Sequence, residues 1–197
     1  TSCAVPVFAD DAAAEGGKIG ISMPTQSLER WNRDGSYLEE QFKAAGYDVE
    51  LTYSDNETDR QVNDIQNLIS DGVNLLVVAA IDGEALNTVM DEAADAGIPV
   101  IIVDRMVDVS DDSLYTAWVG SNFKLEGQKA MAWLDAYLEA KGRGDEEINL
   151  VDIQGTIGAS AQIGRTEGFD EAVEAHDNWT TLAQQSGEFT QAKGQEV

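Results

Sequence analysis

The chain is poor in the residues that disulfides, metal sites and many nucleophilic active sites require. Its 197 residues include one cysteine, Cys3, and one histidine, His176, so no internal disulfide can form. Positive charge is also scarce, because 12 Lys and Arg stand against 37 Asp and Glu, a formal net charge of −25. This balance argues against binding to nucleic acid or to anionic membranes. It favours solubility, and an acidic face for a basic partner is the alternative.

Catalytic and cofactor motifs are missing as well. The sequence has no nucleophile elbow, no phosphate-binding G-x-x-x-x-G-K-[ST] loop and no G-x-G-x-x-G after its first expected strand. His176 lies in a polar segment after an expected helix, which is typical of a solvated histidine. The acidic run from Asp55 lacks the glycine that a calcium loop needs for its bend. We therefore predict no metal, no cofactor and no enzymatic activity.

No hydrophobic run is long enough to span a bilayer. Residues 1–17 resemble the end of a secretory signal followed by a linker. Small residues before Asp10 fit ordinary signal cleavage, whereas Thr1-Ser2-Cys3 fit the end of a lipobox, with lipid on Cys3. A disordered cytosolic tail is the alternative. We expect a protein that is periplasmic or held at the cell surface.

From Lys18 onward, segments with the pattern of strands alternate with segments with the pattern of helices. The hydrophobic content of 43% permits a real core. The expected strands cover residues 18–23, 48–53, 74–80 and 98–103, and the expected helices cover 31–45, 57–70 and 84–96, with glycine after each helix. This order implies an α/β fold with a doubly wound parallel sheet and right-handed crossovers.

A second set of elements follows a short expected strand at residues 115–119. After the turn Gly120–Asn122 come a helix, a buried strand, a helix and a strand, over residues 124–140, 148–153, 159–175 and 180–185. We predict an N-terminal lobe over residues 18–121 and the start of a C-terminal lobe over 122–197. The second lobe is incomplete in this sequence, so we expect the 197-residue chain to expose core and to be unstable alone.

The most informative segment is the apolar run Ile98–Val103, which ends in Asp104-Arg105. Such a run suits a strand buried on both faces of a parallel sheet. Open α/β sheets bind ligands at the carboxyl ends of their strands. The acceptors of Asp104 and the planar donors of Arg105 match a vicinal diol. A surface ion pair is the alternative.

Other polar and aromatic side chains also follow expected strands. Arg30-Trp31 comes after the first strand, where the tryptophan offers an apolar face to a sugar ring or belongs to the core. The amides of residues 156–160 suit an anion or a hydroxyl-rich ligand, or simply begin a helix. Arg165 lies within that helix, and Phe189 follows the last strand. Because they all lie near one edge of the expected sheets, we expect these groups to form one site.

These motifs resemble the type I solute-binding proteins of bacterial sugar ABC transporters, the ribose-, xylose- and galactofuranose-binding family. Residues 20–31 are similar to the xylose and multiple-sugar branch, whereas residues 154–169 and 186–194 are similar to the galactofuranose and ribose branch. The sugar therefore stays open among pentoses, fructose and galactofuranose. The resemblance implies a two-lobe periplasmic-binding-protein type I fold that closes on one monosaccharide and delivers it to an ABC transporter permease.

The resemblance also implies which side chains touch the sugar. The family's aromatic residues sandwich the ring and its charged residues bond the hydroxyls; in this sequence the matching positions are Arg30, Trp31, Asp104, Arg105, Arg165 and Phe189. A LacI-type regulator's sugar-sensing domain shares this fold, but residues 1–17 are too short for its helix-turn-helix. A sugar-modifying α/β enzyme is a third hypothesis, which the scarcity of His and Cys disfavours.

Overall fold

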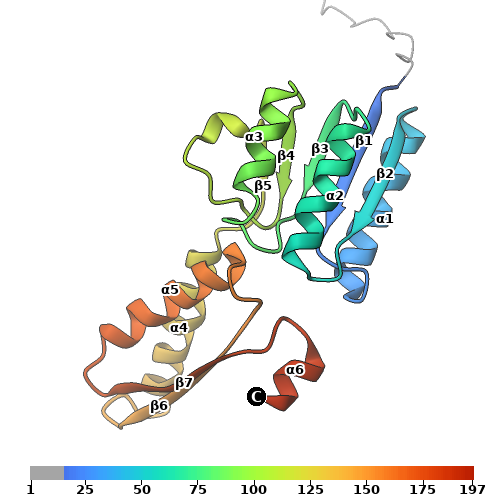
Figure 1. Cartoon of the computed structure of the whole chain (residues 1–197). Coiled ribbons are helices and arrows are strands. Elements are labelled where there is room, and N and C mark those ends of the chain that lie inside the picture. The colour runs from blue at the N-terminus through green and yellow to red at the C-terminus, as the bar shows by residue number, and fades with distance from the viewer. Residues whose placement is uncertain (1–15) are drawn as a thin grey trace, which may run out of the picture.

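The structure is a computed structural model that describes residues 16–197, so both cleavage motifs and Cys3 lie outside the described range. Its first part, here called the N-terminal unit, contains a parallel five-stranded sheet in the order β2-β1-β3-β4-β5 (Figure 1). The strands are β1 (Lys18–Met23), β2 (Asp48–Tyr53), β3 (Leu75–Val78), β4 (Val100–Val103) and β5 (Ala117–Val119). The α/β fold class and the parallel sheet are therefore confirmed.

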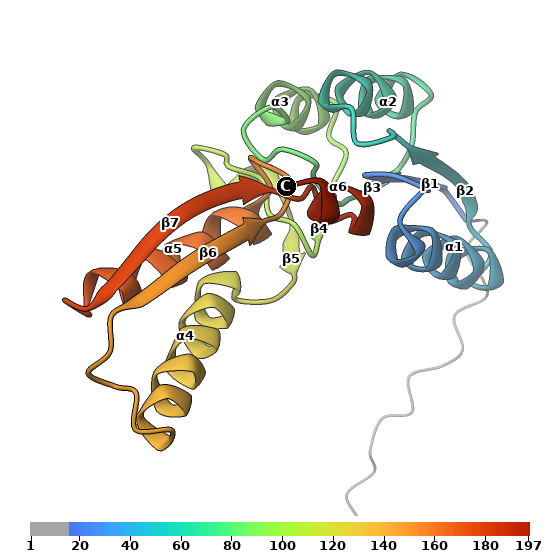
Figure 2. The same ribbon diagram turned by 90° about the horizontal axis from the view of Figure 1, so that it is seen from below.

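Helices cover both faces of this sheet. They are α1 (Glu29–Ala44), α2 (Thr58–Ser70) and α3 (Asn87–Asp95), with a short 3₁₀ turn, η1 (Asp112–Leu114). Figure 2 shows α1 on one face and α2 and α3 on the other. Each face has its own core: Ile21 and Trp31 pack on the α1 side, and Leu68 and Ile102 pack on the α2 and α3 side. Strands buried on both faces explain the continuous apolar runs in the sequence.

The second part, here called the C-terminal unit, has a parallel pair of strands, β6 (Ile148–Gln154) and β7 (Trp179–Ser186). Its helices are α4 (Phe123–Ala140), α5 (Ser160–Glu174) and α6 (Gln191–Glu196). A core of Met131, Leu138, Ile148 and Trp179 joins α4 and α5 to one face of the strands. Residues 120–122 lie between β5 and α4, and the lobe boundaries at residues 18–121 and 122–197 stay a prediction.

Three expectations need correction. The strand at residues 148–153 was expected to be buried, but alternate side chains of β6 are solvent-exposed, including Val151 at 58% and Ile153 at 56%. Helix α3 begins at Asn87 rather than residue 84, because Asp82 Oδ1 accepts hydrogen bonds from the two amides at residues 84 and 85 (3.0 and 3.2 Å) and forms a turn there. Strand ends differ as well, because β3 ends at Val78, two residues early, and β4 and β5 begin at Val100 and Ala117, each two residues late.

Across residues 16–197, no helix is both long enough and apolar enough to cross a bilayer.

Candidate functional site

All six predicted site residues line one cleft between the two units. The cleft has a volume of about 190 Å³, and its other lining residues are Leu28, Glu29 and Ala161. Three structural regions meet there: the start of α1, the turn after β4, and the part of the C-terminal unit formed by α5 and the loop after β7. The volume lies below the roughly 300–1,000 Å³ of pockets for drug-sized ligands, so the cleft suits a small molecule.

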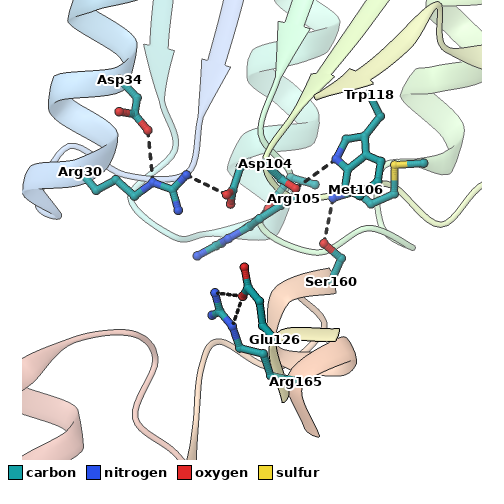
Figure 3. A network of polar contacts seen from close by, with 10 residues as sticks. Arg30, Asp34, Asp104, Arg105, Met106, Trp118, Glu126, Ser160 and Arg165 are labelled. Atoms are coloured by element: carbon teal, nitrogen blue, oxygen red, sulfur yellow. Dashed lines mark hydrogen bonds and ion pairs between the residues drawn. The ribbon is translucent and has the colours of Figure 1, made fainter. Parts of the chain in front are cut away.

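The turn after β4 holds its shape through contacts with β5. Asp104 has a φ of +56°, in the left-handed region that a non-glycine residue rarely adopts. Its amide donates to Val119 O at 2.8 Å, and the indole Nε1 of Trp118 donates to Asp104 O at 3.1 Å (Figure 3). Gly120 permits this arrangement, because a Cβ there would lie 2.7 Å from Asp104 O. Strand β5 therefore fixes the direction of the Asp104 side chain.

Arg30 links the start of α1 to that turn. Its Nη2 donates to Asp104 Oδ1 at 2.7 Å, and its Nε donates to Asp34 Oδ2 at 3.2 Å. Burial opposes the charge of Arg30, but the hydrogen bonds to these two carboxylates outweigh it and raise the pKa of the guanidinium. The Asp104 side chain is only 16% exposed, so this ion pair is partly shielded from water. The pair is thus positioned before any ligand arrives.

Arg105 is the most buried charged group of the cleft, with 2% of its surface exposed. Its guanidinium carbon lies 5.0 Å from the ring centre of Trp31 and 5.1 Å from that of Phe189, so the two aromatic rings flank it. Burial lowers the pKa of Arg105 to about 10; Arg30 and Arg165 also lower it, and Asp104 raises it. The group still carries its charge at neutral pH.

Arg105 also keeps hydrogen-bonding capacity for a ligand. Within residues 16–197 its guanidinium makes one hydrogen bond, from Nη1 to Ala80 O at 3.5 Å. A guanidinium has five N–H donors. The remaining donors are therefore available to acceptors that enter the cleft.

The C-terminal unit contributes Arg165 from α5. Its Nε and Nη2 both contact Glu126 Oε2, at 3.0 and 2.9 Å, and its guanidinium carbon lies 5.1 Å from the ring centre of Phe123. Close packing of α4 and α5 brings these groups together, since a Cβ on Gly127 would lie 2.4 Å from Arg165 O. Sequence reasoning missed Glu126 as a partner, because the two residues are 39 positions apart.

Phe189 lies in a loop with an unusual backbone. Glu188 and Phe189 both have positive φ, +52° and +57°. The ring lies against Gly155, where a built Cβ would come within 1.9 Å of Phe189 Cζ. Gly155 therefore makes room for the ring that forms one side of the cleft.

Two other expectations concern His176 and the loop 156–160. The His176 side chain is 30% exposed, so it is partly solvated, and its ring also stacks on Trp179 with 3.9 Å between ring centres. The loop leads into α5, which begins at Ser160, and Ser160 accepts a hydrogen bond from the amide of Met106 at 2.8 Å. Among residues 16–197, no group of three or more His, Cys, Asp and Glu side chains has a geometry suited to a metal.

Comparison with known proteins identifies a common family. The model of the periplasmic binding protein domain matches residues 19–197. The galactofuranose-binding protein YtfQ of Escherichia coli (strain K12) is 34% identical over 152 residues, which cover 77% of this chain and 46% of YtfQ. The multiple sugar-binding periplasmic receptor ChvE of Rhizobium radiobacter is 38% identical over 138 residues, which cover 70% of this chain and 39% of ChvE.

A solved structure agrees with these relatives. The crystal structure of a galactofuranose binding protein superposes with a TM-score of 0.81 at 30% identity, covering 91% of this chain and 59% of that one. The chain thus spans less than half the length of the two curated relatives. Because the family model matches nearly all of the described residues and the solved fold coincides, the chain belongs to the periplasmic binding protein domain family.

Proposed function

We propose that this chain is part of an extracytoplasmic solute-binding protein that captures a monosaccharide and passes it to an ABC transporter permease. The observation that supports this most directly is the meeting of six predicted ligand contacts in one small cleft between two α/β units. The galactofuranose specificity in the names of YtfQ and of the solved neighbour favours a furanose ring. The protein acts as a carrier and leaves its ligand chemically unchanged.

The chemistry of the cleft matches an uncharged polyol. Three arginines, Arg30, Arg105 and Arg165, supply donors, and the carboxylates of Asp34, Asp104 and Glu126 balance their charge. Trp31 and Phe189 line the cleft with apolar surface on either side of the Arg105 guanidinium, while Asp104 supplies acceptors. A sugar that lacks a hydroxyl would leave one of the buried partners without a hydrogen bond, at a cost of about 1–3 kcal/mol. The site would therefore reject that sugar.

Binding would favour closure of the two units. Arg105 and Asp104 belong to the N-terminal unit, whereas Arg165 and Phe189 belong to the C-terminal unit. A ligand that contacts both sets binds the closed arrangement better than an open one, and so shifts the population toward it. The permease would then receive the closed, loaded form. A lipid anchor at Cys3 belongs to the same proposal, and residue 3 lies outside the described range.

The test is calorimetric titration of the full-length protein with D-ribose, L-arabinose, D-galactose, D-xylose, D-fructose and D-glucose. We expect saturable binding of at least one sugar, with the sugar recovered unchanged. Arg105→Ala should weaken that binding about tenfold or more, because it removes a buried donor set. Arg143→Ala is the matched control, since Arg143 pairs with Glu146 on an exposed linker.

Asp104→Asn provides a second variant of similar shape if Arg105→Ala lowers the melting temperature. Unchanged affinity in both site variants would refute the assignment of these residues. Failure to bind any of the six sugars would refute the proposed ligand class.

A further inference from the structure

The two units touch through hydrogen bonds that lie outside the set of predicted sugar contacts. The amide of Met106, directly after Arg105, donates to Ser160 Oγ at 2.8 Å across the gap between the units (Figure 3). Nearby, the amide of Gly83 approaches Gly158 O at 3.4 Å. Within residues 16–197 these are the direct hydrogen bonds that join the N-terminal to the C-terminal unit, and both involve the segment that leads into α5.

We propose that Ser160 is a positioning residue that holds the turn carrying Asp104 and Arg105 against α5. The inference rests on the proposed function, because it concerns how the same cleft closes. Arg165 lies on α5, five residues after Ser160. A bond from the Ser160 hydroxyl to the backbone after Arg105 therefore sets the spacing between the two arginines from opposite sides of the cleft.

The hydroxyl of Ser160 is not explained by the needs of its own helix. The N-cap of α5 is Ala159, and no side chain caps that end. Ser160 follows the cap, inside the helix, and its Oγ bonds the other unit instead. Removing the hydroxyl therefore removes the contact between units without removing a helix cap.

The turn that receives this bond is one that needs support. Asp104 has a φ of +56°, and the turn is held on one side by Trp118 Nε1 at 3.1 Å from Asp104 O. Ser160 supplies the contact from the other side, and that contact exists only while the units are close. The bond thus favours the closed arrangement and should act mainly on the rate at which ligand leaves.

The experiment compares wild type, Ser160→Ala and Ser160→Thr in the full-length protein, with Ser70→Ala as a control on the exposed end of α2. The first readout needs no sugar: hydrogen exchange of the Gly83 amide. Its acceptor, Gly158 O, is intact in Ser160→Ala, so this amide reports separation of the units and not loss of its own bond. We expect several-fold faster exchange in Ser160→Ala and wild-type exchange in Ser160→Thr and Ser70→Ala.

The second readout is stopped-flow dissociation of L-arabinose and of D-galactose. A sugar that binds wild type should dissociate about three- to tenfold faster from Ser160→Ala, while its association rate should stay within about twofold of wild type. Ser160→Thr should restore the wild-type dissociation rate. Unchanged Gly83 exchange, or unchanged dissociation of a bound sugar, would overturn the role of Ser160. If neither sugar binds wild type, the choice of sugars fails, and the exchange measurement still decides the role of Ser160.

Discussion

The two units are built from the same parallel α/β pattern but bury their strands differently. In the N-terminal unit, helices lie on both faces of the sheet, and Ile21 in β1 is fully buried. In the C-terminal unit, α4 and α5 pack on one face, and the opposite face leaves Ile153 and Leu182 exposed at 56% and 63%. An apolar run in a sequence therefore shows that a strand suits burial, but the surrounding elements decide which faces are covered.

The comparison extends to the ligand cleft. The N-terminal unit presents Arg105 at 2% exposure on a turn held by β5, whereas the C-terminal unit presents Arg165 with its side chain 45% exposed and paired with Glu126. One side of the cleft is thus preformed and shielded, and the other is more open to solvent. Closure should therefore reduce the solvent exposure of Arg165 more than that of Arg105.

The largest expected effect comes from replacing an isoleucine in each unit, which compares a buried strand face with an exposed one. In the 197-residue chain, Ile21→Ala should lower the free energy of unfolding by about 2–5 kcal/mol, because it leaves a cavity in a closed core. Ile153→Ala should lower the free energy of unfolding by about 0.5 kcal/mol or less, because Ile153 is already solvent-exposed in the folded chain. Urea unfolding followed by circular dichroism measures both. Equal losses would show that the exposed face of β6 is covered in solution.

A smaller effect concerns how the C-terminal unit shapes the cleft. Gly155→Ala should weaken sugar binding about tenfold in the full-length protein, because the new Cβ would displace the Phe189 ring that it meets at 1.9 Å. The ring is the free end of a side chain, so the melting temperature should change little. Calorimetric titration and a thermal melt separate the two effects.

The control for this variant is Gly194→Ala in α6, where a Cβ meets no atom within 4 Å. It should leave sugar affinity unchanged. A large loss of stability without loss of affinity in Gly155→Ala would show that the Phe189 ring does not shape the ligand site.

Sequence reasoning anticipated the element order and the meeting of the six residues in one cleft, because they lie in segments that follow strands of the two sheets, where open α/β sheets bind ligands. It did not anticipate Glu126 beside Arg165 or Ser160 beside Met106. Those contacts depend on how α4 crosses α5 and how the units approach, which no local pattern encodes. The positive φ of Asp104 was also unexpected, since a non-glycine residue adopts it only when neighbours such as Trp118 enforce it.

The smallest expected effect contrasts the polar interiors of the two units. In the N-terminal unit, the buried Gln61 side chain donates to Ser22 Oγ and Ala79 O and accepts from the Ile81 amide, all neutral partners. In the C-terminal unit, Asp152 Oδ2 is buried without a hydrogen-bond partner within the described residues. Burial raises the pKa of Asp152 above its ordinary 3.8, and the charge of Asp170 adds to this, while Gln154 and Thr166 oppose it.

The sign of the pH dependence follows from that raised pKa. Above the folded-state pKa the carboxylate is charged in both the folded and unfolded states, so its burial destabilises the fold in full; below 3.8 it is neutral in both, and the penalty disappears. Asp152→Asn should therefore raise the melting temperature by about 1–2 °C at pH 7, and the gain should shrink as the pH falls and vanish below pH 3.8. Exposed Asp145→Asn is the control and should show no such pH-dependent gain. A gain that persists at low pH would mean that the asparagine stabilises by new hydrogen bonds, and that the charge of Asp152 is not the cause.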